Sequence, residues 1–131
     1  MPRALRKLTQ DLDESTDLDV RLDLGMADDV RLAPETAQAL YRVAQEGLTN
    51  VQRHARATCA WVCVSPPTDT ITLRVEDDGV GPSGPAQAPG DGGLGLVGLR
   101  ERVALLGGRL AFGPGRDGGA RLEVTLPLEP A

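Results

Sequence analysis

The stretch that decides the fold runs from Gln45 to His54 and reads QEGLTNVQRH. At about 100° per residue on a helix, Glu46, Asn50 and Arg53 fall within a sector of roughly 60°. Apolar side chains centre almost opposite this sector: Leu40, Ala44, Leu48, Val51 and Ala55. The spacing therefore predicts an amphipathic helix with a buried back and a front that carries a carboxylate, an amide and a cation.

Hydrophobic periodicity predicts further elements on both sides of this helix. The helix itself is expected to begin at Pro34, which a first helical turn tolerates, and to run to about Arg56. The other expected elements are a helix over residues 2–14, strands over 17–24, 58–65 and 70–77, a loop over 79–93, a helix over about 94–106, and a hairpin of strands near 109–113 and 120–127. This order favours an α+β fold, a two-layer sandwich in which helices cover one face of a mixed, mostly antiparallel sheet.

Length and composition limit the classes of function. At 131 residues the chain is one domain by length. A net charge of −5 and only 2% aromatic residues argue against nucleic-acid binding, which needs basic surfaces and stacking side chains. We expect a cytoplasmic protein without direct membrane contact, because there is neither a long apolar run nor a signal peptide; a membrane anchor in a parent protein stays open. With two cysteines and one histidine, the sequence argues against a zinc site.

The second informative stretch is VEDDGVG at residues 75–81. Period two places Asp77 on the apolar side of its strand, and a buried carboxylate needs a partner. The exocyclic amine of a purine is such a donor, and Gly79 and Gly81 would let the backbone approach a flat base. The alternative is an aspartate that begins a turn, which is the favoured interpretation for the next residue, Asp78.

The polar front of the long helix fits a metal ion bound together with phosphates. Mg²⁺ prefers oxygen ligands and takes one or two from protein, so Asn50 and Glu46 suit it. Arg53 and His54, one turn on, are placed to meet phosphate oxygens. The alternative is a solvated helix face. His54 is the only histidine. One interpretation is a phospho-accepting or general-base role, because imidazole titrates near neutral pH. The other is a residue that packs in the core or contacts a phosphate.

A glycine pattern precedes the last expected helix. Residues 93–98, GLGLVG, match G-x-G-x-x-G, but no strand precedes them and no βαβ unit follows, so the dinucleotide-binding interpretation fails. Glycines at a helix N-terminus still present free N–H groups to an anion. We therefore expect Gly93 and Gly95 on the phosphate side of a lid, with helix packing as the alternative for Gly98.

In this order, QEGLTNVQRH, VEDDGVG, GLGLVGLRERV and GGARLEVTLPL resemble the ATP-binding catalytic domain of bacterial two-component sensor histidine kinases. The subfamily is the one with a Q-E-x-x-T-N-x-x-[KR]-H helix, within the superfamily that includes the Hsp90, gyrase and MutL ATPases. The resemblance covers about residues 17–128 and implies a Bergerat-type ATP-binding fold. Residues 17–131 would form the catalytic domain, with a flexible lid at about 82–92, and residues 1–16 a helix at the tail of a helical dimerisation segment.

The resemblance also implies roles for individual residues. Asn50 would coordinate Mg²⁺, Glu46 would assist through water or as a base, and Asp77 would read adenine. Ala120 stands where many relatives carry a threonine, which removes one expected hydrogen bond on the adenine side. The residues implied in ATP binding are Asn50, Arg53, His54, Asp77, Gly79, Gly81, Gly93, Leu94, Gly95 and Leu96.

Such domains donate the γ-phosphoryl group of ATP to a histidine on the dimerisation domain of the same kinase, which passes it to a response regulator. No such acceptor segment is recognisable here, so we expect the chain alone to bind ATP and Mg²⁺ as a monomer without autophosphorylating. The full-length kinase would be a homodimer. Two alternatives stay open: a stand-alone anti-sigma-factor serine kinase of the same superfamily, and a non-catalytic ATP-binding interaction domain.

Overall fold

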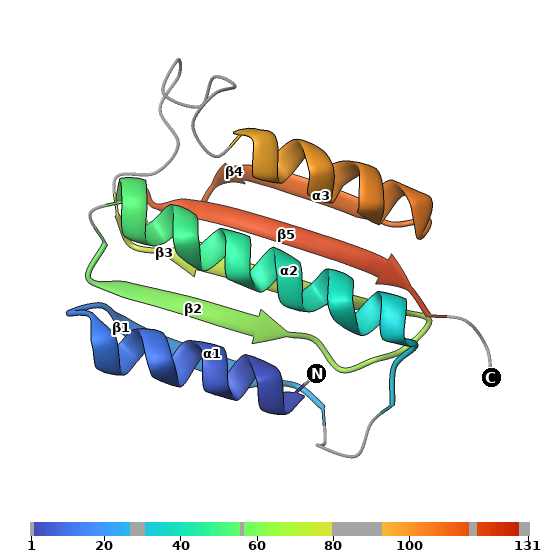
Figure 1. Ribbon diagram of the computed structural model, residues 1–131, viewed down its shortest axis with the longest axis horizontal. Coiled ribbons are helices and arrows are strands. Elements are labelled where there is room, and N and C mark those ends of the chain that lie inside the picture. Colours follow the sequence, from blue (N-terminus) through green and yellow to red (C-terminus); the bar gives the residue numbers. More distant parts are fainter. Residues whose placement is uncertain (1, 27–30, 56, 80–92, 116–117, 129–131) are drawn as a thin grey trace.

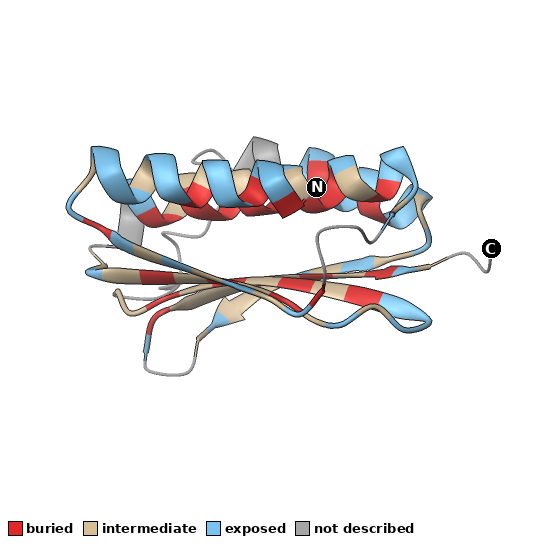
Figure 2. Ribbon diagram, turned by 90° about the horizontal axis from the view of Figure 1, so that it is seen from below, coloured by how far each residue is buried: buried red, intermediate tan, exposed pale blue. Residues whose placement is uncertain are grey.

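The computed structural model describes residues 2–26, 31–55, 57–79, 93–115 and 118–128. Its elements, in chain order, are α1 (Pro2–Ser15), β1 (Asp19–Leu24), α2 (Pro34–Asn50), a π-helical turn (Val51–Ala55), β2 (Cys59–Val64), β3 (Thr70–Asp77), α3 (Gly93–Leu105), β4 (Arg109–Pro114) and β5 (Ala120–Pro127). The helices lie side by side on one face of the sheet, as Figures 1 and 2 show. Among the helices in these ranges, none is both long and apolar enough to cross a membrane.

The described strands form one sheet in the order β1-β2-β3-β5-β4. β1 and β2 are parallel, because α2 carries the chain back across the sheet between them. All other neighbouring strands are antiparallel. The predicted α+β sandwich with a mixed, mostly antiparallel sheet is therefore confirmed.

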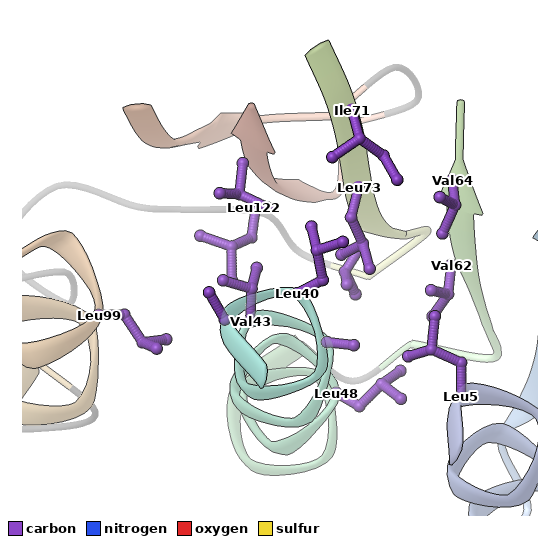
Figure 3. Close-up of a cluster of buried hydrophobic side chains, with 14 of the residues drawn as sticks. Leu5, Leu40, Val43, Leu48, Val62, Val64, Ile71, Leu73, Leu99 and Leu122 are labelled. Carbon is purple, nitrogen blue, oxygen red and sulfur yellow. The ribbon is translucent and has the colours of Figure 1, made fainter. Parts of the chain in front are cut away.

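The core lies between the helices and the covered face of the sheet. Alternate residues of β3, namely Ile71, Leu73 and Val75, are buried and meet the apolar side of α2. Figure 3 shows Leu5 of α1 on one side of the α2 residues and Leu99 of α3 on the other. Leu5 is fully buried, so α1 belongs to the same packed layer; its continuation into a dimerisation segment stays a prediction.

The long helix extends to Ala55, close to the predicted end at about Arg56, but its last turn differs from the regular α-helix that the periodicity predicts. The α-helix ends at Asn50, and a wider π-helical turn from Val51 to Ala55 replaces the regular turns expected up to about Arg56. The Thr49 hydroxyl donates to the Gln45 carbonyl over 2.9 Å, a side-chain bond that competes with the regular backbone pattern here. Turns of this kind are frequent at functional sites. The expected lid at 82–92 lies outside the described residues.

Candidate functional site

Four elements meet at one end of the molecule, on the left in Figure 1. The C-terminal ends of α2 and β3 lie there together with the beginning of β5, and α3 begins on the same side but nearer the middle of the view. These ends carry most of the residues that the sequence singles out: Glu46 and Asn50 on α2, Asp77 and Gly79 at the end of β3, and Gly93, Leu94, Gly95 and Leu96 in the first turn of α3. Sequence segments that lie far apart along the chain therefore converge on one region.

A glycine lets α2 lie close to the sheet. A Cβ atom on Gly47 would lie 3.0 Å from both Cβ and Cγ2 of Val75, closer than side chains usually approach. Gly47 stands between Glu46 and Asn50, and Val75 stands two residues before Asp77. The close approach therefore occurs where the polar stripe of the helix reaches the acidic end of the strand.

Asp77 is a buried carboxylate, with only 5% of the residue exposed. Its Oδ1 accepts hydrogen bonds from the backbone N–H groups of Gly79, at 2.8 Å, and Ala120, at 3.3 Å. Burial raises the pKa of the Asp77 carboxyl, and these two N–H groups oppose the rise. Among the described residues nothing donates to Oδ2 and no cation pairs with Asp77, so one carboxylate oxygen is left for a ligand.

Unlike Asp77, Asp78 has hydrogen-bond partners for both of its carboxylate oxygens among the described residues. Its Oδ2 accepts a hydrogen bond from the Thr58 hydroxyl at 2.7 Å, and its Oδ1 accepts the N–H groups of Thr58 and Cys59, each at 2.9 Å. The Thr58 hydroxyl, together with these N–H groups, lowers the pKa of the Asp78 carboxyl. Asp78 therefore anchors the start of β2, through residues about 20 positions away, and the interpretation of Asp78 as a residue that begins a turn is corrected. The short bond across the turn is made by Asp77 instead, which accepts the N–H of Gly79.

The polar stripe of α2 is available for a ligand. Glu46 and Asn50 are half-buried, and within the described ranges no hydrogen bond or ion pair engages either side chain. Arg53 is exposed and lies with His54 in the π-helical turn, so it follows Asn50 at a different angle from the one expected on a regular helix. Gly81 lies outside the described residues.

The described side chains contain no cluster of three or more His, Cys, Asp or Glu that could hold a metal ion. A metal ion held by the described residues at this end would therefore need other ligands as well, such as an amide oxygen or the phosphates of a bound nucleotide. A separate hollow of about 380 Å³ lies between α2 and α3. None of the residues that line this hollow is a predicted site residue. The lining residues are Glu35, Gln38, Gly98, Glu101, Arg102, Leu105 and Leu106.

Sequence reasoning missed two residues that shape this region, Gly47 and Gly119. A Cβ atom on Gly119 would overlap the Asp77 carbonyl oxygen and lie 2.9 Å from its Oδ1. The only signal in the sequence is the double glycine before the last strand, and its position in a hairpin turn explains it without any contact to Asp77.

Comparison with known proteins identifies the fold and the family. Residues 35–130 match the family model described as histidine kinase-, DNA gyrase B-, and HSP90-like ATPase. The chain is 34% identical over 127 residues to the sensor histidine kinase YxjM of Bacillus subtilis, covering 95% of this chain and 30% of that protein. It is 36% identical over 129 residues to the signal transduction histidine-protein kinase/phosphatase UhpB of Salmonella typhimurium, covering 97% of this chain and 24% of that protein. The chain thus spans less than a third of the length of these relatives.

Solved structures agree with this result. The blue-light activated histidine kinase of Erythrobacter litoralis EL346 superimposes with a TM-score of 0.76 at 26% identity, over 95% of this chain and 40% of that chain. The ATP binding domain of PrrB from Mycobacterium tuberculosis superimposes with a TM-score of 0.63 at 20% identity, over 98% of this chain and 90% of that chain, and shares the fold. The chain described here therefore belongs to the family of histidine kinase-, DNA gyrase B- and HSP90-like ATPases.

Proposed function

We propose that this chain is the ATP-binding catalytic domain of a sensor histidine kinase, which donates the γ-phosphoryl group of ATP to a histidine on a separate dimerisation domain. The relatives named above are sensor kinases, and this chain covers only part of each. The observation that carries the proposal is the buried carboxylate of Asp77, with one oxygen held by the backbone and the other free of described partners.

Asp77 would recognise the adenine base. An ionised carboxylate only accepts hydrogen bonds, and the exocyclic amine of adenine donates one. Because the site is buried, a base without that donor would leave Asp77 unsatisfied, which is costly. Gly79 and Gly81, the next glycines along the chain, would complete the base side of the pocket.

Asn50 and Glu46 would hold Mg²⁺ together with the phosphates. Both side chains lie one helical turn apart on α2 and are free of described partners, and oxygen donors are the ligands that Mg²⁺ prefers. The ion, when bound, would neutralise charge on the phosphate oxygens. Glu46 would in addition act as a base or hold a water molecule in the site.

The phosphate side of the pocket would combine cations with a helix terminus. Arg53 and His54 stand three and four residues after Asn50, in the π-helical turn. Gly93, Leu94, Gly95 and Leu96 form the first turn of α3, whose free N–H groups and dipole favour an anion. Catalysis would then consist of positioning and charge neutralisation, as phosphoryl transfer requires.

The partners follow from the reaction. The acceptor would be the histidine-containing dimerisation domain of the same kinase, and a response regulator would receive the phosphoryl group from it. The full-length kinase would be a homodimer, while this chain by itself would be monomeric and would not autophosphorylate.

Titration calorimetry with ATP, with and without Mg²⁺, tests the proposal. We expect Mg²⁺-dependent binding to the wild-type chain, loss of the Mg²⁺ dependence in Asn50→Ala, and weak binding at either condition in Asp77→Asn. The matched control is Asp23→Asn, which removes an exposed carboxylate on β1 and should bind as wild type. Absence of ATP binding to the folded wild-type chain would refute the proposal.

A second measurement separates a kinase from its alternatives. Labelled ATP is incubated with this chain and a fragment that carries the acceptor histidine of the same kinase. Acid-labile label on the fragment is the expected result. Binding of ATP without transfer would favour the non-catalytic interaction domain, and acid-stable phosphoserine on a partner would favour the serine kinase.

A further inference from the structure

Gly119 lies against Asp77 more closely than any other residue type would allow. A Cβ atom at this position would overlap the Asp77 carbonyl oxygen, and would lie 2.6 Å from the Asp77 carbonyl carbon and 2.9 Å from Oδ1. Two of these three atoms belong to the backbone of β3, which cannot rotate away as the end of a flexible side chain can. Any side chain at position 119 must therefore push the start of β5 away from the end of β3.

The hydrogen bond from Ala120 depends on this close approach. Ala120 follows Gly119 directly, and its N–H donates to Asp77 Oδ1 at the long end of hydrogen-bond distance, 3.3 Å. The regular pairing of β3 with β5 ends one step earlier, at Glu76 and Arg121. The Ala120 N–H thus serves the Asp77 side chain, and a small shift of β5 is enough to break the bond.

The two N–H donors fix the direction of the carboxylate. The Gly79 N–H lies on the same chain segment as Asp77 and holds Oδ1 at 2.8 Å, while the Ala120 N–H holds the same oxygen from the neighbouring strand. With Oδ1 held from two elements, Oδ2 keeps one position. A ligand that donates to Oδ2 therefore meets an acceptor that is already oriented.

We propose that Gly119 is a positioning residue for nucleotide recognition: its missing side chain lets the Ala120 N–H orient Asp77, and this orientation sets the preference for a base that carries an exocyclic amine. The inference rests on the proposed function, because it concerns the same site. Gly119 lies in the turn between β4 and β5. Although it has no side chain, it would determine which base the site prefers.

The test compares ATP with inosine triphosphate, in which a carbonyl oxygen replaces the exocyclic amine. We expect the wild-type chain to prefer ATP. In Gly119→Ala the affinity for ATP should fall at least ten-fold and the affinity for inosine triphosphate much less, so that the ratio of the two affinities collapses toward one. A merely structural defect would lower both affinities together and leave their ratio unchanged.

Gly113→Ala is the matched control. It adds the same methyl group to the other strand of the same hairpin, at a position where a Cβ atom meets nothing within 4 Å. Both affinities should stay at their wild-type values. A folded Gly119→Ala variant that keeps the wild-type ratio within two-fold would overturn the inference.

If Gly119→Ala does not fold, Ala120→Pro tests whether the Ala120 N–H orients Asp77. Proline removes the N–H that Asp77 accepts and adds nothing at position 119, and the first residue of a strand tolerates proline. The same collapse of the ratio is expected; an unchanged ratio would overturn the inference. If the wild-type chain binds neither nucleotide, the proposed function itself fails, which is a different result from a retained ratio.

Discussion

The two faces of the sheet hold neighbouring acidic side chains in different ways at the end of β3. On the face without helices, Glu76 Oε1 lies 2.9 Å from Arg74 Nε and 3.8 Å from Arg121 Nη1. On the covered face, Asp77 is more buried and pairs with no cation among the described residues. A cation beside Asp77 would occupy the oxygen that a ligand needs. The comparison teaches that, at this strand end, one face pairs its carboxylate with cations, while the other leaves Asp77 Oδ2 without a described partner, as the proposed adenine site requires.

The largest expected effect comes from Asp77→Asn. The amide oxygen can still accept the two backbone N–H groups, but an amide at the Oδ2 position presents a donor where adenine needs an acceptor. We expect ATP affinity to fall about 100-fold, or roughly 2.7 kcal/mol, while the free energy of unfolding stays the same or rises. Titration calorimetry and urea unfolding measure the two quantities.

Glu76→Gln is the control from the other face. It removes the adjacent carboxylate and leaves the covered face intact, so ATP affinity should stay within about two-fold of wild type, or 0.4 kcal/mol. An equal loss of affinity in both variants would mean that the acidic strand end acts as a diffuse charge, and the contrast between the faces would be wrong.

The next effect concerns stability and comes from Asp78→Ala. This change removes the acceptor for three hydrogen bonds at the start of β2. Because these groups are partly exposed, water replaces some of the bonds, and we expect a loss of about 1–2 kcal/mol in the free energy of unfolding. Urea unfolding measures the loss. Thr58→Val, which removes only the hydroxyl bond, should give about half of it. An unchanged unfolding midpoint in Asp78→Ala would contradict the anchoring role.

The pH dependence of stability should separate the two aspartates. The pKa of Asp78 is lowered, so its contribution is present above the unfolded pKa of about 3.9 and is lost as the pH falls through the lower folded value. The pKa of Asp77 is raised, so the folded state binds the extra proton. Its ionisation therefore lowers stability as the pH rises from about 3.9 through the folded value.

Urea unfolding of the wild-type chain, Asp77→Asn and Asp78→Asn across pH 2.5–7 measures these trends. The difference in the free energy of unfolding between the wild type and Asp78→Asn should become smaller as the pH falls. As the pH rises, the free energy of unfolding of the wild type should fall relative to that of Asp77→Asn. Parallel curves for both variants would show that the two carboxyls have the same surroundings, which would contradict the comparison.

The sequence predicts the fold well because period two and period 3.6 are local signals. The alternation in β3 places Asp77 on the buried face, and the structure confirms this. The polar stripe of α2 could likewise be predicted up to Asn50. The π-helical turn after it could not, because Val51 is buried in this turn just as it would be in a regular α-helix.

The contacts that complete the site could not be predicted in the same way. The Asp77–Ala120 bond joins residues 43 positions apart, and it forms only because β5 lies next to β3. The bonds from Asp78 to the start of β2 likewise depend on strand order, which periodicity does not contain. Glycines such as Gly47 and Gly119 give no sign in the sequence of what their missing side chains avoid. What decides these contacts is tertiary packing.

The smallest expected effect is that of Glu123→Gln on the face without helices. Arg74 Nη1 lies 3.9 Å from Glu123 Oε2, and the two side chains are 31% and 36% exposed. Exposed pairs of this geometry contribute about 0.2–1 kcal/mol, and here Arg74 keeps its closer partner Glu76, so we expect a loss at the low end of that range. The free energy of unfolding at low and high salt measures it, and the difference from wild type should shrink with salt because surface charges are screened. A larger, salt-independent loss would mean that the face without helices depends on this ion pair for stability, whereas Asp77 on the covered face is expected to add none. The contrast at the end of β3, where Glu76 is paired with arginines and Asp77 has no cation among the described residues, would then not reflect a difference between structural and binding charges.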